Sequence, residues 1–229
     1  EFNIALEGVI EYDFPKNEWK MEGTLPGFSG DDNNKIYGTT NSVDLLIGGD
    51  GDDEIYALAP GESSGGFEVD VLYGLKGNDK LVGGQGLNLL VGGDGDDNIT
   101  GGDYANFIFG DGYSLAGNPF NQLNALKEKK LTTASGLIPV GSGEDLITGG
   151  SGLDVIIGGD KRDVIQAGDG VNIVFGDELT LATGVEIDLT QIFSEADAAT
   201  EIIGDKILTG LGNDTIIGGS GIDIFSGGH

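Results

Sequence analysis

Acidic side chains recur in this chain at intervals of nine residues, each after a glycine-rich stretch. The clearest example is residues 83–109, which read GGQGLNLLV, GGDGDDNIT and GGDYANFIF. The units fit the template G-G-x-G-x-D-x-U-x, in which U is large and apolar and Asn can replace Asp, with Tyr104 at the fourth position of the last unit. Glycine adopts positive φ angles without steric cost, so the first six residues can form a tight turn. Such a turn directs backbone carbonyls and the sixth side chain inward, and Ca2+ prefers oxygen ligands, about six to eight per ion.

Fifteen such units can be counted, in blocks of three, five, four and three. The eighth residue is Ile, Leu, Val or Phe in every unit, which predicts a short strand whose middle side chain faces a core. The units in 74–109 align with those in 140–175 at a common offset of 66, and both sets end in Phe-Gly-Asp. We therefore interpret the chain as a window on a longer tandem array.

These units resemble the RTX, or haemolysin-type calcium-binding, repeats, most closely in the units that begin at 48, 92 and 149. The resemblance implies a secreted or cell-surface protein that leaves the cell by type I secretion and folds when it meets extracellular calcium. The long inserts and the 66-residue super-period are more similar to giant RTX adhesins or matrix proteins than to compact secreted enzymes.

The expected fold is all-β, a right-handed parallel β-roll (β-solenoid) with two units per turn, inserted loops and one short helix at 119–130. Units n and n+2 would then stack at about 4.8 Å. Along the chain we expect a strand-rich segment that continues an earlier repeat block (1–28), a roll block (29–56), a loop (57–64), a roll block (65–109), an insert (110–139), a roll block (140–175), a mostly extended insert (176–199) and a truncated roll block (200–229).

The candidate metal ligands are the side chains at the sixth position. The acidic ones are Asp44, Asp53, Asp70, Asp79, Asp97, Asp145, Asp154, Asp163, Asp205, Asp214 and Asp223, and the amides are Asn34, Asn88, Asn106 and Asn172. An amide oxygen can coordinate but adds no charge, so weaker sites are expected at the asparagines. Turn carbonyls would complete the sites, and the glycines of the clearest turns are Gly48, Gly49, Gly51, Gly83, Gly84, Gly86, Gly92, Gly93, Gly95, Gly149, Gly150, Gly152, Gly218, Gly219 and Gly221. Glu68, Lys161 and Arg162 replace the third turn glycine or its neighbour, which predicts altered turns there.

The expected number of ions depends on the inserts. If every insert breaks the stacking, about seven sandwiched calcium sites form, and if the inserts merely bulge out, about thirteen form. The formal net charge is −28, from 39 acidic and 11 basic residues, so a compact state needs bound cations. The same charge argues against nucleic acid and anionic membranes as partners.

Composition also limits the chemistry. There is no cysteine, and the single histidine is His229, so neither thiolate chemistry nor a nucleophile–histidine–acid triad inside the chain is available. No apolar run is long enough to span a membrane. Carboxylate pairs such as Glu186 and Asp188 arise by chance in so acidic a chain, and we expect no enzymatic activity.

The outward-facing positions seven and nine alternate in character. They are apolar in every second unit (Val71/Tyr73, Leu89/Val91, Phe107/Phe109) and mostly polar in the units between (Lys80/Val82, Asn98/Thr100). One sheet of the roll should therefore have an apolar outer face. Either the inserts fold back over this face, or it docks to a neighbouring module or another copy.

Two other functions fit the same pattern. A glycan-binding accessory module, similar to the roll modules of alginate epimerases, would need an aromatic and basic groove. A parallel β-helix polysaccharide lyase or epimerase would need a basic residue in a cleft. Glycan binding would favour the first of these, and calcium-dependent turnover of a uronate polymer the second.

Overall fold

The computed structural model describes residues 2–5, 10–13, 18–21, 33–40, 43–63, 68–115, 130–132, 137–177, 186–188, 205–212, 214–218 and 224–227. These ranges contain strands and turns but no helix. Most of the expected helix at 119–130 lies outside them, and Lys130 begins a strand, β12 (Lys130–Thr132).

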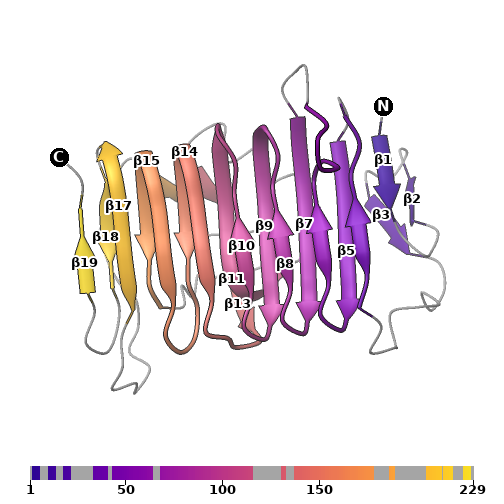
Figure 1. The fold of residues 1–229 in the computed structure, drawn as a ribbon. Helices are drawn as coiled ribbons and strands as arrows, with labels where there is room; N and C mark the ends of the chain where they lie inside the picture. Colours follow the sequence, from indigo (N-terminus) through magenta and orange to yellow (C-terminus); the bar gives the residue numbers. More distant parts are fainter. Residues whose placement is uncertain are drawn as a thin grey trace.

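The repeats form two stacks of parallel strands that face each other across a narrow core (Figure 1). We call one stack the apolar-faced sheet; it contains β5 (Val43–Asp50), β7 (Glu68–Lys76), β9 (Gly86–Asp94), β11 (Ala105–Leu115), the second halves of β14 (Leu146–Ile157) and β15 (Val164–Phe175), and β18 (Thr215–Ile217). The polar-faced sheet contains β4 (Lys35–Tyr37), β6 (Glu54–Tyr56), β8 (Lys80–Val82), β10 (Asn98–Thr100), the first halves of β14 and β15, β17 (Lys206–Gly212) and β19 (Ile224–Ser226). Strand β1 (Phe2–Ala5) pairs with β5 at the end of the apolar-faced sheet.

The register confirms that alternate repeats stack. In the apolar-faced sheet Leu72 pairs with Leu90, and Leu90 pairs with Ile108. In the polar-faced sheet Leu81 pairs with Ile99. Each full turn of the chain therefore consists of two nonapeptides, and the fold is the expected parallel β-roll.

The eighth residue of most units lies in the core between the sheets; Ile36 and Ile216 are partly buried, and Phe225 in β19 is exposed. Leu46, Ile55, Leu72, Leu81, Leu90, Ile99, Ile108, Ile147, Ile156, Ile165, Val174 and Ile207 are all fully buried in one cluster. Each fills the space beside the eighth residue of the layers before and after it. This aliphatic column is the main source of hydrophobic stabilisation, at about 1.5–3 kcal/mol for each fully buried side chain.

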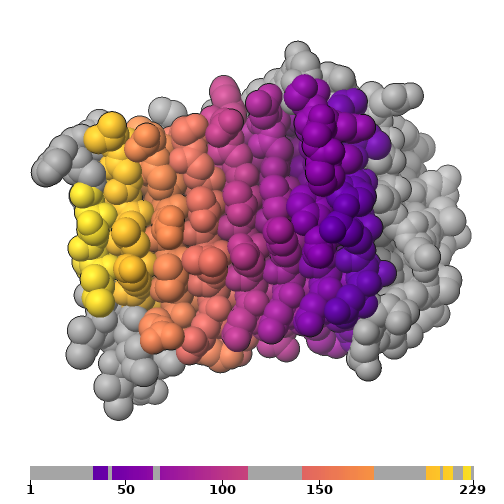
Figure 2. Space-filling model, viewed as in Figure 1, coloured from indigo at the N-terminus to yellow at the C-terminus, as the bar shows by residue number. Residues whose placement is uncertain are grey.

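Stacking is continuous across the inserts. Ile99 of β10 pairs directly with Ile147 of β14, although a long insert separates them in the chain. Ile165 of β15 pairs in the same way with Ile207 of β17 across the second insert. The described layers follow one another in chain order over the visible face of the molecule (Figure 2). The inserts therefore leave the roll without interrupting it.

The outer face of the apolar-faced sheet is buried within the single chain. Leu89, Phe107 and Phe109 are fully buried, and the two phenylalanine rings lie 4.5 Å apart. This burial agrees with the interpretation in which the chain itself covers that face. The described residues include no helix that could cross a membrane.

Three further strand pairs lie beside the roll. β11 pairs antiparallel with β13 (Leu137–Val140), and β2 (Ile10–Asp13) pairs antiparallel with β3 (Glu18–Met21). β12 pairs antiparallel with β16 (Glu186–Asp188), so segments of the two long inserts contact each other. Strand β16 falls in the insert that was expected to be mostly extended.

Candidate metal sites

The sixth-position side chains form two columns, one along each edge of the roll. We call the edge with Asn34, Asp53, Asp79, Asp97, Asp145, Asp163 and Asp205 the aspartate edge. The other edge, which we call the mixed edge, carries Asp44, Asp70, Asn88, Asn106, Asp154, Asn172 and Asp214. The structure thus brings together nearly all the predicted ligands; Asp223, Gly219 and Gly221 lie outside the described residues.

Along the aspartate edge, each carboxylate is hydrogen bonded to the adjacent layer through one oxygen. The amide of Asp79 donates to Oδ1 of Asp97 (2.7 Å), and the amide of Asp97 donates to Oδ1 of Asp145 (2.8 Å). The same bond joins Asp145 to Asp163 at 2.8 Å. These bonds fix the orientation of every carboxylate in the column, because each Oδ1 is held by a main-chain group of a neighbouring turn.

The second oxygen of these carboxylates is buried and accepts no hydrogen bond from any described residue. This holds for Oδ2 of Asp53, Asp79, Asp97, Asp145 and Asp163. A Cβ on Gly92 would overlap Oδ2 of Asp97 and the carbonyl oxygen of Gly110, so this turn needs glycine at its first position. Oδ2 therefore faces other oxygen atoms in a space that holds no donor, an arrangement that costs free energy unless a cation enters.

The inserts open inside turns, between the first glycine and the sixth residue. A Cβ on Gly110 would overlap Oδ2 of Asp145, and a Cβ on Gly176 would overlap Oδ2 of Asp205. Gly110 and Asp145 are therefore the two ends of one turn, although 34 residues lie between them. Asp111, which follows Gly110, is buried, and its Oδ2 accepts the amide hydrogen of Asp160 at 2.5 Å. The repeat pattern placed the inserts between units and did not single out Asp111 as a site residue.

Burial raises the pKa of several sixth-position carboxyls. On the aspartate edge, desolvation is the largest cause, and neighbouring carboxylates add to it, so the pKa is raised to about 7 for Asp79 and Asp145, about 9 for Asp97 and about 10 for Asp163. On the mixed edge, desolvation raises the pKa of Asp70 to about 8. It raises that of Asp154 only to about 6, since Asn106 donates a hydrogen bond to this carboxylate.

The mixed edge has a different hydrogen-bonding pattern at its asparagines. Nδ2 of Asn106 donates to Oδ1 of Asp154 at 2.7 Å, and Nδ2 of Asn88 donates to Oδ1 of Asn106 at 2.9 Å. Nδ2 of Asn172 donates to Oδ1 of Asp214 at 3.1 Å. At these three layers the side chains themselves bridge the gap.

The atypical turns are accommodated locally. Lys161, in place of the third glycine, adopts a positive φ of 71°, and Leu75, in place of a second glycine, adopts 91°. Arg162 forms an exposed ion pair with Glu144 of the preceding layer at 3.1 Å. Glu68 is buried within β7 and pairs in register with Gly86, so this turn continues into strand.

A second ladder runs along the surface of the aspartate edge at position five. The amide of Asn78 donates to Oδ1 of Asp52 at 2.8 Å, and the amide of Asp96 donates to Oδ1 of Asn78 at 3.0 Å. The amide of Glu144 continues the ladder by donating to Asp96 at 2.9 Å. The signal was present in the sequence, because position five is polar on this edge and mostly apolar on the other, where Leu87 packs on the outer cluster.

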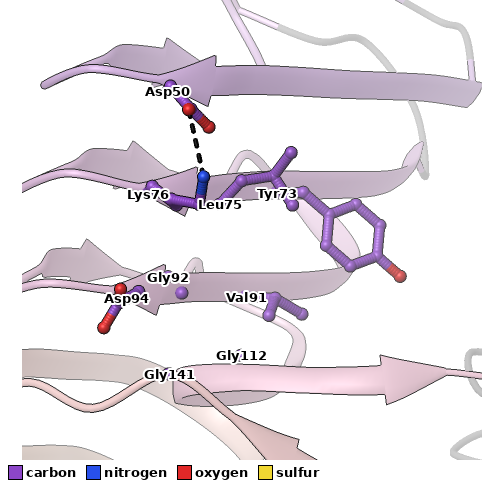
Figure 3. Close-up of a pocket in the computed structure, with 10 residues that line it drawn as sticks. Asp50, Tyr73, Leu75, Lys76, Val91, Gly92, Asp94, Gly112 and Gly141 are labelled. Carbon is purple, nitrogen blue, oxygen red and sulfur yellow. Dashed lines mark hydrogen bonds and ion pairs between the residues drawn. The ribbon is translucent and has the colours of Figure 1, made fainter. Parts of the chain in front are cut away.

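A shallow cavity of about 400 Å³ lies beside the aspartate edge, at the base of the first long insert (Figure 3). Tyr73 and Val91 form its apolar side, and Asp50 pairs with Lys76 at its charged rim at 3.0 Å. Burial raises the pKa of the Tyr73 hydroxyl further above its ordinary value. The ten lining residues include no histidine, serine or cysteine; their carboxylates are Asp50, which is paired with Lys76, and Asp94.

The oxygen atoms of the aspartate edge are suitable ligands for a hard divalent cation. Carboxylate Oδ2 atoms and turn carbonyls are the ligands that Ca2+ prefers. Nowhere in the described residues do three acidic or histidine side chains converge, so an ion would take most of its ligands from the main chain. The fold and these edges define a parallel β-roll with calcium-type turns.

The comparison with protein families leads to the same class. The model of the RTX calcium-binding nonapeptide repeat matches residues 39–59, 64–99, 91–112, 140–160, 148–178 and 204–228. These segments make up more than half of the chain, which therefore belongs to the RTX calcium-binding nonapeptide repeat family. No curated protein and no solved structure matches the chain. The chain is thus a calcium-binding structural repeat domain; such domains are typical of secreted proteins and are not usually enzymatic.

Proposed function

We propose that this chain is a structural segment of an extracellular adhesin or matrix protein, and that extracellular calcium folds and rigidifies it. The observation that carries the proposal is the column of buried, similarly oriented carboxylates on the aspartate edge. Oδ2 of Asp79, Asp97, Asp145 and Asp163 accepts no hydrogen bond from the described residues. Without a counterion at neutral pH, these buried carboxyls either repel one another as charges across adjacent layers or must take up protons.

The energetic balance favours coupled folding and binding. Closing the aliphatic column requires the turns to stack, and stacking brings the carboxylates together in a poorly solvated space. An ion between two turns removes this repulsion and satisfies the oxygens. Because the sites do not exist in the unfolded chain, the free energy of ion binding becomes free energy of folding.

The continuous stacking sets the number of gaps that could hold ions. Along the described part of the chain, six gaps separate the seven sixth-position residues of each edge, which gives twelve in total. Asp223 would add a thirteenth gap beyond Asp205. We propose that the ions lie in these gaps, with the inserts bulging out of the turns.

Circular dichroism of the full chain with and without calcium tests this function. We expect a large gain of β signal at about millimolar Ca2+ and none with the same concentration of Mg2+, which does not readily exchange its water shell for such a cage. A variant with asparagine at Asp79, Asp97, Asp145 and Asp163 should depend less on calcium for folding than wild type does. A chain already fully folded in chelator at neutral pH would contradict the proposal.

A second candidate function, glycan binding, is favoured by one surface cluster. Tyr37 and Tyr56 stack on the polar-faced sheet with ring centroids 5.4 Å apart. The ammonium groups of Lys35 and Lys80 lie 5.5 and 5.4 Å from the Tyr56 ring. Glu54 accepts hydrogen bonds from Lys35 and from the Tyr56 hydroxyl. Exposed aromatic rings beside lysines can stack on sugar rings and pair with acidic sugars.

Calorimetric titration with a uronate oligosaccharide in calcium tests this candidate. Binding that is lost in Tyr56→Ala but retained in Gln166→Ala, an exposed position on the same sheet, would support an accessory glycan-binding module. Depolymerisation or epimerisation of the oligosaccharide would instead indicate an enzyme. The absence of binding would leave the structural role as the better account.

A further inference from the structure

The asparagines of the mixed edge make hydrogen bonds that the aspartates of the other edge do not make; Asn34, at the start of the aspartate edge, has a similar side-chain hydrogen bond to Asp53. Nδ2 of Asn106 donates to the carbonyl oxygen of Gly102 in its own turn (3.1 Å) and of Gly149 in the next layer (3.4 Å). It also donates to Oδ1 of Asp154 at 2.7 Å. One amide nitrogen thus lies among three oxygen atoms contributed by two stacked turns.

The same arrangement recurs at two other layers. Nδ2 of Asn88 donates to the carbonyl oxygen of Gly84 (3.2 Å) as well as to the side chain of the next layer. Nδ2 of Asn172 donates to the carbonyl oxygen of Gly168 (2.9 Å) as well as to the next layer. In each turn the carbonyl belongs to the glycine-rich segment that was expected to supply calcium ligands.

The two edges can be compared atom by atom. A Cβ on Gly92 would meet Oδ2 of Asp97, and a Cβ on Gly101 would meet the side-chain amide of Asn106. In both cases it would also meet the carbonyl oxygen of the first residue of the next layer's turn. Oδ2 of aspartate and Nδ2 of asparagine therefore occupy equivalent places. Oδ2 can only accept, so it needs a cation, whereas Nδ2 donates directly to oxygens of both turns. Oδ1 of Asn88 and of Asn172 is buried and accepts no hydrogen bond from the described residues.

We propose that the amides of Asn88, Asn106 and Asn172 take the place of calcium in three gaps of the mixed edge. The proposal rests on the proposed function, because it assumes that the corresponding gaps of the aspartate edge hold ions. It reduces the expected ions in the described gaps of the mixed edge from six to three. It also makes the roll asymmetric: the successive aspartates from Asp53 to Asp205 on one edge need calcium, and the other edge remains hydrogen bonded at these three layers without it.

Counting the calcium ions bound to the full chain tests whether these amides replace calcium, by adding a carboxylate on one edge and removing one on the other. Equilibrium dialysis with elemental analysis should show that Asn106→Asp binds one more calcium ion than wild type. Asp97→Asn, at the equivalent place on the other edge, should bind one fewer and remain folded. Asn98→Asp, an exposed change of the same kind on β10, is the matched control and should leave the number unchanged.

Two results would overturn the proposal. One is an unchanged ion count in a folded Asn106→Asp variant. The other is the loss of one ion in a folded Asn106→Ala variant, because only a ligating asparagine would cause that loss. Circular dichroism in calcium establishes whether each variant is folded.

A second measurement keeps the test independent of these variants. In chain labelled with ¹⁵N-asparagine, the side-chain amides of Asn88, Asn106 and Asn172 should exchange slowly with solvent, and that of exposed Asn98 quickly. Fast exchange at all four would overturn the proposal even if variants fail to fold. If wild type binds no calcium at all, the proposed function fails, while slow exchange would still support the amide bridges.

Discussion

Acidification should fold this chain without calcium, because protons can neutralise the carboxylates that ions would otherwise neutralise. Six buried aspartates have raised pKa values in the folded roll, mainly through desolvation: about 6 for Asp154, 7 for Asp79 and Asp145, 8 for Asp70, 9 for Asp97 and 10 for Asp163. The ordinary value for an exposed aspartate, and so for the unfolded chain, is 3.8.

The sign of the effect follows from proton linkage. Since the folded pKa values are higher than the unfolded value, the folded roll binds more protons, and its stability falls as the pH rises from about 4 to about 10. The excess is about six protons at pH 5 and about four at pH 7. Each excess proton is equivalent to ~1.4 kcal/mol per pH unit, so the calcium-free roll loses roughly 5–8 kcal/mol of unfolding free energy per pH unit between about pH 5 and about pH 7, and less per unit above that.

The assay is far-ultraviolet circular dichroism in chelator, from about pH 7.5 to about pH 5, with sedimentation to show that the chain stays monomeric. We expect a steep gain of β signal within this range. The fourfold aspartate-to-asparagine variant of the aspartate edge should show a much flatter dependence, because an amide is neutral at every pH. Its control carries the same change at the exposed Asp52, Asp94, Asp96 and Asp103 and should behave like wild type. A flat signal in wild type, or an unchanged dependence in the fourfold variant, would refute the reasoning.

The remaining predictions concern packing and metal removal. Gly92→Ala should strongly reduce calcium-dependent folding, because the added Cβ would overlap Oδ2 of Asp97. Gly84→Ala is the control and should have little effect on the calcium midpoint of folding, because its Cβ would meet only ordinary contacts of 3.5 Å or more. Equal midpoints in the two variants would contradict this prediction. Phe107→Ala should cost about 3–5 kcal/mol in urea unfolding with calcium, because its fully buried ring packs on the apolar-faced sheet, whereas Thr100→Ala on the other sheet should cost under about 1 kcal/mol. Chelation of folded chain at neutral pH should cause a loss of β signal that added Ca2+ restores, and persistence of the full signal would count against ion-dependent stability.

Much of the fold follows from the nonapeptide pattern alone. An apolar eighth residue in every unit predicts one interior column, and Leu72, Leu90 and Ile108 do stack in it. The turn glycines predict where the chain reverses. A side chain in place of Gly92, for example, would overlap the carboxylate of Asp97. These features are local or repeat at short range, so a single sequence is sufficient to infer them.

The sequence by itself determined the period, the interior column and the chemical type of the candidate ligands, because each is set by residues within one repeat. Only the tertiary structure decided that Gly110 and Asp145 form one turn, since this depends on which layers become neighbours after a long insert. It also separated the edge where Asp97 presents a buried oxygen without a donor from the edge where the two amide hydrogens of Asn106 are shared among three oxygens. The hydrogen bonds that distinguish the two edges join stacked turns, and stacking is a property of the folded roll.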